Sequence, residues 1–303
     1  MKKATLCILT ILLLVCLAAP SVWAADEGNL EYELVEDKDA AFEVEMDMVK
    51  SIAIGPDQKI YVAGSKGVHI FNADGERTGK IDSESPYTAI AVGDDGKVYA
   101  ASRWQVNVYD KDGNKETAYG EKGRDPGQFL FITGLALKNG FIYIADAGSR
   151  RVSRFATVGD YVDYIDGFLI PSPYFDLVFD SKGMLVLGHT GKHRVEYYDA
   201  NHELTKNWGQ FGSNAEGFCG CCNPCNLYVM DDGRVITAEK GIPRLKIYST
   251  DGEMLAFLGG KENFNPSTEG MDLAVDKDDR IVLLDSFQNK VRFFNIKENG
   301  ASK

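Results

Sequence analysis

Four cysteines lie within one seven-residue segment, Cys219-Gly-Cys221-Cys222-Asn-Pro-Cys225. Thiols this close in sequence cannot link distant parts of a fold. They predict either two local disulfides, Cys219–Cys225 and Cys221–Cys222, or a site where the sulfurs converge on one soft metal ion. Adjacent and one-apart cysteines suit copper(I) above all, with zinc as an alternative whose structural sites normally use two separated pairs. A bond between neighbouring cysteines is strained and comparatively reducible, so a redox-active dithiol is a third alternative.

The elements that must position these thiols come from a repeat. Spacings of 38, 45, 42, 50 and 46 residues separate six copies of one pattern, which begin at Ser51, Ala89, Gly134, Asp176, Asn226 and Asp272. Each copy holds two short apolar strands joined by a polar turn, then a third strand and a second turn. Units of four strands at roughly forty-residue spacing are typical of β-propellers. The sequence therefore predicts an all-β ring of six four-stranded antiparallel blades.

The last copy supplies only three strands before the chain ends, near Val291–Phe294. Spare strand-forming residues precede the first copy, between Leu30 and Glu45. We expect this N-terminal strand to complete the last blade and close the ring, because closure leaves no long unpaired edge.

The third copy is the sharpest, with Gly123-Arg-Asp-Pro-Gly-Gln-Phe129, then Gly134-Leu-Ala-Leu137, then Ile142-Tyr-Ile-Ala-Asp-Ala-Gly-Ser-Arg-Arg-Val152. These residues resemble an NHL repeat, and the resemblance extends more weakly over nearly all of the chain after the leader. It implies a six-bladed propeller of the exported bacterial type. It implies function poorly, because such rings serve as binding platforms, lyases and signalling ectodomains.

Alignment of the fifth copy with the third places the cysteines in the connection between two blades. In a propeller this connection lies on the same face as the loops between second and third strands. One face near the axis is therefore expected to gather a ligand-binding set. Its candidate members are Asp146, His189, His193, Glu239, Lys240, Arg244 and Asp285.

Each of these candidates has a structural alternative. His189 is a candidate metal ligand or acid–base group, or else an ordinary hydrogen-bonding histidine. In the NHL pattern the aspartate at position 146 pairs with a nearby arginine, for which Arg151 is available, and Asp285 occupies the matching position. Lys240 and Arg244 could bind an anion or could simply be solvated.

The chain opens with two lysines, an apolar run from Leu6 to Ala19 and small residues up to Ala24. This pattern predicts a cleaved signal peptide, residues 1–24, followed by a single domain, residues 25–303. No second apolar run is long enough for a membrane span. We therefore expect a periplasmic or extracellular protein in a compartment that permits disulfides. The leader also contains the remaining cysteines, Cys7 and Cys16.

Loss of the two leader lysines takes the formal net charge from −12 to −14. Such acidity argues against nucleic acid and anionic membrane surfaces as partners, and favours a small molecule, a metal ion or another protein. The sequence favours an exported binding protein with a cysteine-rich ligand or soft-metal site on the channel face. One alternative is a metal-dependent lyase or hydrolase in which His189, Glu239 or Asp285 acts with a bound ion. Another is a structural protein-interaction ectodomain with local disulfides.

Overall fold

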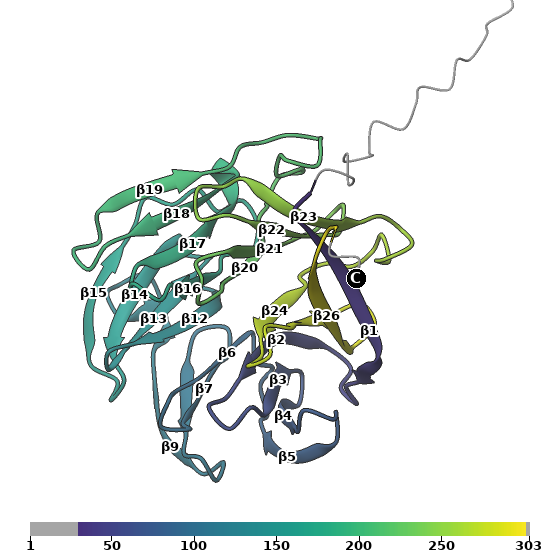
Figure 1. Ribbon diagram of the computed structural model, residues 1–303. Helices are drawn as coiled ribbons and strands as arrows, with labels where there is room; N and C mark the ends of the chain where they lie inside the picture. The colour runs from purple at the N-terminus through teal and green to yellow at the C-terminus, as the bar shows by residue number, and fades with distance from the viewer. Residues whose placement is uncertain (1–29, 301–303) are drawn as a thin grey trace, which may run out of the picture.

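The structure, a computed structural model, describes residues 30–300 and shows six blades around a central axis (Figure 1). The all-β class, the six four-stranded antiparallel blades and the closing N-terminal strand are confirmed. The expected signal peptide lies outside the described residues. No helix within residues 30–300 is long and apolar enough to cross a membrane.

Each blade runs from an innermost first strand to an outermost fourth strand. Blade 1 contains β2 (Val49–Ile54), β3 (Ile60–Gly64), β4 (Gly67–Phe71) and β5 (Arg77–Asp82). Blade 2 contains β6 (Ala89–Val92), β7 (Val98–Ala101), β8 (Val106–Tyr109) and β9 (Lys115–Tyr119). Blade 3 contains β12 (Ile132–Lys138), β13 (Phe141–Asp146), β14 (Arg151–Ala156) and β15 (Tyr161–Ile165).

Blades 4 to 6 follow the same order. Blade 4 contains β16 (Leu177–Phe179), β17 (Leu185–His189), β18 (Arg194–Tyr198) and β19 (Leu204–Trp208), with the short 3-10 helix η2 (Thr190–Lys192) between β17 and β18. Blade 5 contains β20 (Asn226–Val229), β21 (Val235–Glu239), β22 (Arg244–Tyr248) and β23 (Met254–Gly259). Blade 6 contains β24 (Asp272–Val275), β25 (Ile281–Asp285), β26 (Lys290–Glu298) and β1 (Tyr32–Glu43). A two-stranded parallel pair, β10 (Glu121–Lys122) and β11 (Gln128–Phe129), joins blade 2 to blade 3.

Buried hydrophobic side chains fill the spaces between neighbouring blades, in six clusters. Between blades 2 and 3, for example, Val106 and Val108 share a cluster with Ile142 and Ile144. Second and third strands supply most of this core because they are paired on both edges and covered on both faces. Their continuous apolar runs follow from that double burial.

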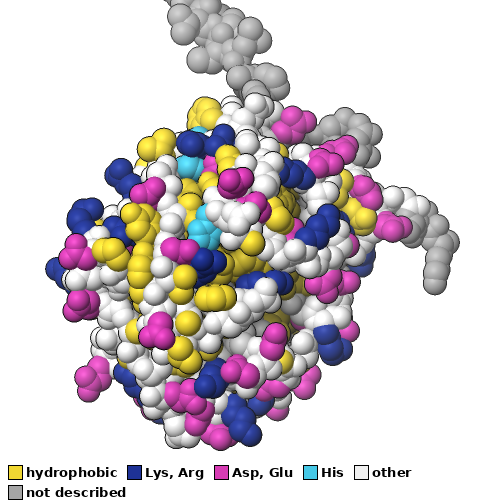
Figure 2. Space-filling view, turned by 90° about the vertical axis from the view of Figure 1, so that its left-hand side faces the viewer, with side chains coloured by type: hydrophobic (Ala, Val, Ile, Leu, Met, Phe, Trp, Pro, Cys, Tyr) yellow, Lys and Arg dark blue, Asp and Glu magenta, His cyan; other side chains and the backbone are white. Residues whose placement is uncertain are grey.

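The outer edge of the ring is mixed in character. Figure 2 faces the side formed by the outer strands of blades 3 and 4, where hydrophobic and charged side chains alternate over the surface. The exposed hydrophobic residues there include Val162 and Tyr164 of β15 and Leu204 of β19. Single apolar residues on an outer strand are ordinary for a protein surface.

The ring closes through β1, which pairs antiparallel with β26 from Tyr32↔Glu298 to Glu43↔Lys290. The side chain of Leu34 enters the core between blades 5 and 6. Arg292 of β26 binds Glu36 of β1 through two bonds, of 2.7 and 3.0 Å. The first described strand and the last are thus held by backbone pairing, apolar burial and a bidentate ion pair.

Candidate functional site

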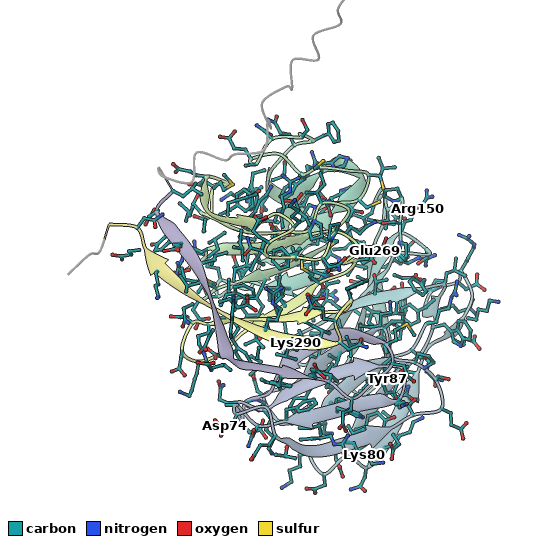
Figure 3. The ribbon with its side chains drawn as sticks, turned by 90° about the vertical axis from the view of Figure 1, so that its right-hand side faces the viewer. Asp74, Lys80, Tyr87, Arg150, Glu269 and Lys290 are labelled. Atoms are coloured by element: carbon teal, nitrogen blue, oxygen red, sulfur yellow. The ribbon has the colours of Figure 1, made fainter. Side chains whose placement is uncertain are left out.

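The ring has two different ends. The connections between blades and the loops between second and third strands lie at one end, which we call the loop face. The turns between first and second strands and between third and fourth strands lie at the other, the turn face. Figure 3 shows Tyr87, Arg150 and Glu269 toward the loop face and Asp74 toward the opposite end.

The cysteine loop, residues 217–225, packs against the loop that follows β21. The amide of Cys219 donates to Glu239 Oε2 over 3.2 Å. Asn223 makes a two-way contact with the backbone of Lys240, with Nδ2 donating to its carbonyl over 2.9 Å and Oδ1 accepting from its amide over 3.0 Å. A Cβ on Gly188 would lie 3.0 Å from Pro224 O, so the loop also touches the end of β17. The cysteines therefore share the loop face with Glu239 and His189.

The four thiols have different surroundings and none is bridged. Cys221 is exposed and Cys222 is buried, yet their sulfurs lie 2.6 Å apart. Cys225 is buried and donates to the carbonyl of Ala238 over 3.1 Å, while Cys219 is half-buried. Within residues 30–300, no group of three or more His, Cys, Asp or Glu side chains is arranged to hold a metal ion. The structure thus brings two of the four sulfurs together.

Burial raises the pKa of the Cys222 thiol, and the bond with Cys221 adds to this rise. The nearby Lys240 ammonium acts in the opposite direction on that pKa. Complete burial raises the pKa of Cys225 well above the usual thiol range. Cys225 therefore remains a protonated core thiol. Because the thiolate is the form that binds metals or attacks electrophiles, Cys225 does neither.

His189 is fully engaged by the protein itself. Its Nε2 accepts from the amide of Leu169 over 2.8 Å, and its Nδ1 lies 2.9 Å from Glu196 Oε2. The side chain is 1% exposed. With both ring nitrogens occupied, His189 fastens the connection between blades 3 and 4 to the core and has no lone pair left for a ligand.

Glu196 is the buried acid beside His189. Burial alone would raise its pKa, but bonds from His189, Tyr198 and Arg194 outweigh burial and lower the pKa to about 2. A depressed folded-state pKa contributes stability above the unfolded-state value of 4.5, and that contribution is lost as the pH falls through the folded-state value.

We expect Glu196→Gln to lower the free energy of unfolding by about 3 kcal/mol at pH 7, because the amide cannot carry the charge that its donors stabilise. The difference from the unchanged protein should shrink as the pH falls from about 4.5 to about 2. Urea unfolding at a series of pH values measures it. Exposed Glu203→Gln is the control, and a difference that persists unchanged below pH 3 would contradict the assignment.

Asp146 and Asp285 hold the loops that follow them. The carboxylate of Asp146 accepts the amides of Leu130, Phe131, Gly148 and Ser149 over 2.8 to 3.1 Å. Asp285 accepts two amides of its own loop over 3.1 Å and lies 3.5 Å from Arg292 NH1. A cationic partner is therefore present in blade 6 but not in blade 3, where Arg151 instead donates to the carbonyl of Arg124.

Glu239 lies between two buried cations beneath the cysteine loop. Arg244 NH2 is 3.1 Å and Lys246 Nζ 2.6 Å from its carboxylate. Both cations also donate to the loop backbone, Arg244 to Asn214 and Lys246 to Gly217. Burial lowers the pKa of Lys246 to about 8, against the opposing charge of Glu239. This cluster supports the cysteine loop from below.

The sequence reasoning missed Lys246, although a signal exists. The third residue of each third strand, or the second in blade 2, is polar or charged and buried, and in blades 4 to 6 it binds the polar end of the second strand. These third-strand residues are His69, Asn107, Ser153, Glu196, Lys246 and Arg292.

His193 and Lys240 border the surface around the exposed thiol. His193 packs edge-on against Phe211, with ring centroids 5.2 Å apart, and burial lowers its pKa. The Lys240 ammonium lies 4.8 Å from the centroid of Tyr174, a cation–π contact. Among the seven candidates outside the cysteines, these two are not consumed by a buried ion pair or an amide cluster.

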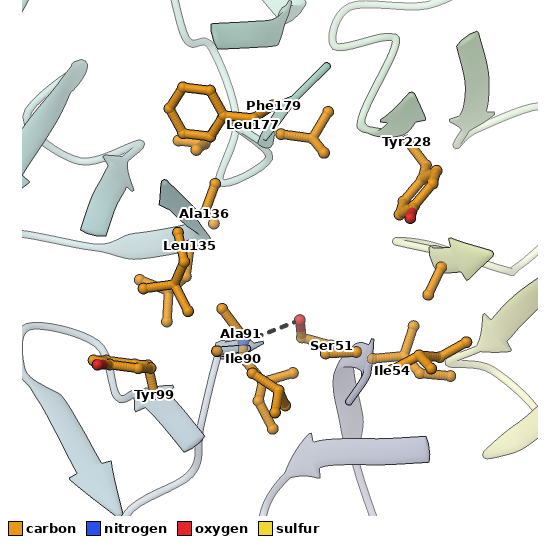
Figure 4. Close-up of a pocket in the computed structure, with 18 of the residues that line it drawn as sticks. Ser51, Ile54, Ile90, Ala91, Tyr99, Leu135, Ala136, Leu177, Phe179 and Tyr228 are labelled. Atoms are coloured by element: carbon orange, nitrogen blue, oxygen red, sulfur yellow. Dashed lines mark hydrogen bonds between the residues drawn. The ribbon is translucent and has the colours of Figure 1, made fainter. Parts of the chain in front are cut away.

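A cavity of about 810 Å³ runs along the axis (Figure 4). Its walls are the six first strands, and none of the residues selected from the sequence lines it.

Each first strand has one neighbouring strand, so its free edge faces the channel. Side chains from the adjacent blade satisfy part of that edge. The bonds run from Leu227 N to Asp176 Oδ2 (3.0 Å), from Ile52 N to Asp272 Oδ2 (2.8 Å) and from Ile90 N to Ser51 Oγ (3.2 Å).

These channel residues also carry a sequence signal. They are first residues of repeat copies, which are polar in four copies (Ser51, Asp176, Asn226 and Asp272) and small in the other two (Ala89 and Gly134). A polar residue recurring immediately before an apolar strand marks the channel end of that strand.

No protein-family model matches the sequence, and no curated protein matches it. Solved structures match in fold. A streptogramin B lyase has a TM-score of 0.59 at 14% identity, covering 88% of this chain and 98% of the other. Virginiamycin B lyase from Staphylococcus aureus gives a TM-score of 0.59 at 14% identity, covering 88% and 99%. A protein of unknown function from Bacteroides caccae gives 0.58 at 16%, covering 74% and 86%. At these identities the likeness shows the six-bladed fold alone.

Proposed function

We propose that this chain is an exported binding protein, a propeller of the NHL type, whose ligand-binding group is the vicinal thiol pair Cys221–Cys222 on the loop face. The observation that carries the proposal is the 2.6 Å separation of the two sulfurs, one of which is exposed. The leader residues 1–24 and the third repeat copy support the export and the NHL type.

The surroundings of the pair favour a thiophilic ligand. Glu239 and Asn223 hold the backbone of the loop on both sides of the pair, so binding of an ion requires the two side chains to rotate apart and does not require the loop to refold. Two adjacent sulfurs suit copper(I), a soft ion that accepts a low coordination number. Zinc, by contrast, normally takes four donors. Binding would release the thiol protons, so the affinity for copper(I) should rise with pH.

The enzymatic alternative has less support from this chain. His189, Glu239 and Asp285 are each occupied by hydrogen bonds or ion pairs within the fold. A general acid or base needs an atom that can reach a substrate. Lyase activity is named only for the structural neighbours. No residue on the described loop face supports assigning that activity to this chain.

We expect Cys221→Ser/Cys222→Ser to weaken copper(I) binding by about 100-fold or more, since ligand loss exceeds the effect of outer-shell changes. The melting temperature should fall by no more than about 3 °C, because Cys221 is exposed and Cys222, although buried, belongs to none of the six hydrophobic clusters between the blades. Titration against a competing copper(I) chelator, alongside zinc, measures binding.

Cys225→Ser is the matched control, since a serine hydroxyl can still donate to Ala238 and the vicinal pair is untouched. Its copper(I) affinity should equal that of the unchanged protein. Equal binding by the double variant, or equal loss in Cys225→Ser, would remove the vicinal pair as the site.

A further inference from the structure

The central channel is separate from the thiol pair and has a chemistry of its own. Its mouth opens between turns of the turn face, including Pro56, Asp94 and Asn139. Its walls present the side chains of Tyr99, Leu135, Phe179 and Tyr228 (Figure 4). A cavity of about 810 Å³ lies in the range of about 300 to 1,000 Å³ that is usual for small-molecule sites.

Two carboxylates line this cavity in blades 4 and 6, with Asn226 of blade 5 between their strands. Asp176 and Asp272 are half-buried, and each gives one oxygen to an amide of the next blade. The other oxygen of Asp272 accepts the amide of Leu273 over 2.9 Å. Gly134 leaves room beside the other oxygen of Asp176, since a Cβ there would come within 3.1 Å of Oδ1.

The pair differs from the other low-exposure acids of the ring. Glu196, Glu239 and Asp285 each have a cation within 4 Å, and Asp146 has four amides. Within residues 30–300, neither Asp176 nor Asp272 forms a salt bridge. Two cations, Lys50 and Lys138, line the same cavity, but among the described residues neither forms a salt bridge with these acids. Burial carries a cost for a carboxylate without a positive partner, so the pair lacks the compensating cation that Glu196, Glu239 and Asp285 have.

The ionisation of the pair reflects this deficit. Burial and the charge of Asp272 raise the pKa of Asp176 to about 8. Burial raises the pKa of Asp272 to about 6, although the amide of Ile52 opposes the rise. Near neutral pH the two carboxyl groups therefore retain about one proton between them. A bound cation could take the place of that proton.

We propose that the channel binds a small organic ammonium ion, with its charged nitrogen between Asp176 and Asp272 and its apolar body along the walls. The size and the walls of the cavity select this class over a bare metal ion. An ion with its first waters fills only part of about 810 Å³, and no group of three or more His, Cys, Asp or Glu side chains among the described residues is arranged to hold a metal ion. Aromatic faces such as Tyr99 and Tyr228 suit an organic cation and its hydrocarbon portion.

The acidic turn face favours the same class of ligand. Asp94 and Asp95 line the mouth, and the four acids of the cavity lining outnumber its two lysines, Lys50 and Lys138, so a cation approaches through a net negative field. The carboxylates farther along the channel then supply the short-range attraction. This gives the cavity a direction, with entry from the turn face and the charged end of the ligand toward the loop face.

The test uses phenethylamine as the probe and 2-phenylethanol as its uncharged match, with calorimetry on the purified protein. We expect the amine to bind at least about 10-fold more tightly than the alcohol, a difference of about 1.4 kcal/mol. The affinity for the amine should increase between pH 6 and pH 8 as the carboxyl pair loses its proton. Asp176→Asn and Asp272→Asn should each weaken amine binding by about 10-fold or more.

An asparagine at either position can still accept the amide of the neighbouring blade, so both variants should fold. Exposed Asp112→Asn removes the same charge on a distant turn and should leave amine binding unchanged. Equal binding of amine and alcohol, unaltered affinity in both channel variants, or no amine binding up to about 10 mM (about −2.7 kcal/mol) would overturn the proposal. So would binding of calcium ions in place of the amine. None of these outcomes bears on copper(I) binding at the thiol pair.

Discussion

A chain that begins at Val44, and so lacks β1, should fail to close its ring. The deletion removes the backbone pairing with β26, the buried Leu34 and the Glu36 partner of Arg292. Arg292, which is 5% exposed, would lose its bidentate partner and keep only the 3.5 Å contact with Asp285, on an open strand edge. We expect a loss of more than about 5 kcal/mol in the free energy of unfolding, and a melting temperature at least about 10 °C lower. Circular dichroism during heating measures both the fold and its midpoint.

The matched control is a chain that begins at Leu30, which keeps the whole of β1 and should melt like the longer protein. A synthetic peptide of residues 30–43 supplies a second test. Added in excess to the shortened chain, it should restore the melting temperature in a concentration-dependent way, since it binds only the folded ring. If the shortened chain melts like the control, β1 contributes nothing to the stability of the ring and the prediction is wrong.

Replacement of Glu239 by alanine should be among the most damaging single changes in the protein. It leaves Arg244 and Lys246 buried without the carboxylate that both contact. Breaking a buried ion pair from one side typically costs about 3 to 5 kcal/mol, or about 10 °C in a domain of this size. The amide of Cys219 also loses its acceptor, so the cysteine loop should become looser and its thiols faster to react with a disulfide reagent.

A double change separates the charge from the packing. In Glu239→Ala/Lys246→Met one stranded cation is replaced by an apolar chain of similar length, so stability should recover in part. Exposed Asp232→Ala, which removes a surface ion pair with Arg234, should cost no more than about 1 kcal/mol. If Glu239→Ala behaves like Asp232→Ala, the cluster is not the support of the loop.

The architecture could be predicted from the sequence because its signals are local and repeated. Each hairpin turn is encoded within a few residues, as at Asp110, whose carboxylate accepts the amides of Asp112 and Asn114 while Gly113 takes a φ of 84°. Six such units leave one unpaired strand, and the spare residues before the first copy identify its partner. The repeat period and the number of strands in each copy were therefore sufficient to predict the fold.

The roles of the candidate site residues could not be predicted in the same way. The sequence shows that polar residues end the second strands, but not that His189 faces Glu196 or that Asp146 is surrounded by amides. Asp176 and Asp272 are far apart along the chain, and only ring closure brings both to one channel. Burial and through-space neighbours determine these roles, and neither is encoded in spacing alone.

The pairing of Tyr32 with Glu298 also determines the order in which the ring can form. The strand β1 leaves the ribosome long before its partner β26 has been synthesised. Until β26 follows, β1 has no partner and the ring stays open. The contact that completes the native state therefore cannot form early. Ring closure is a late step of folding, and the synthesis of β26 sets its earliest time.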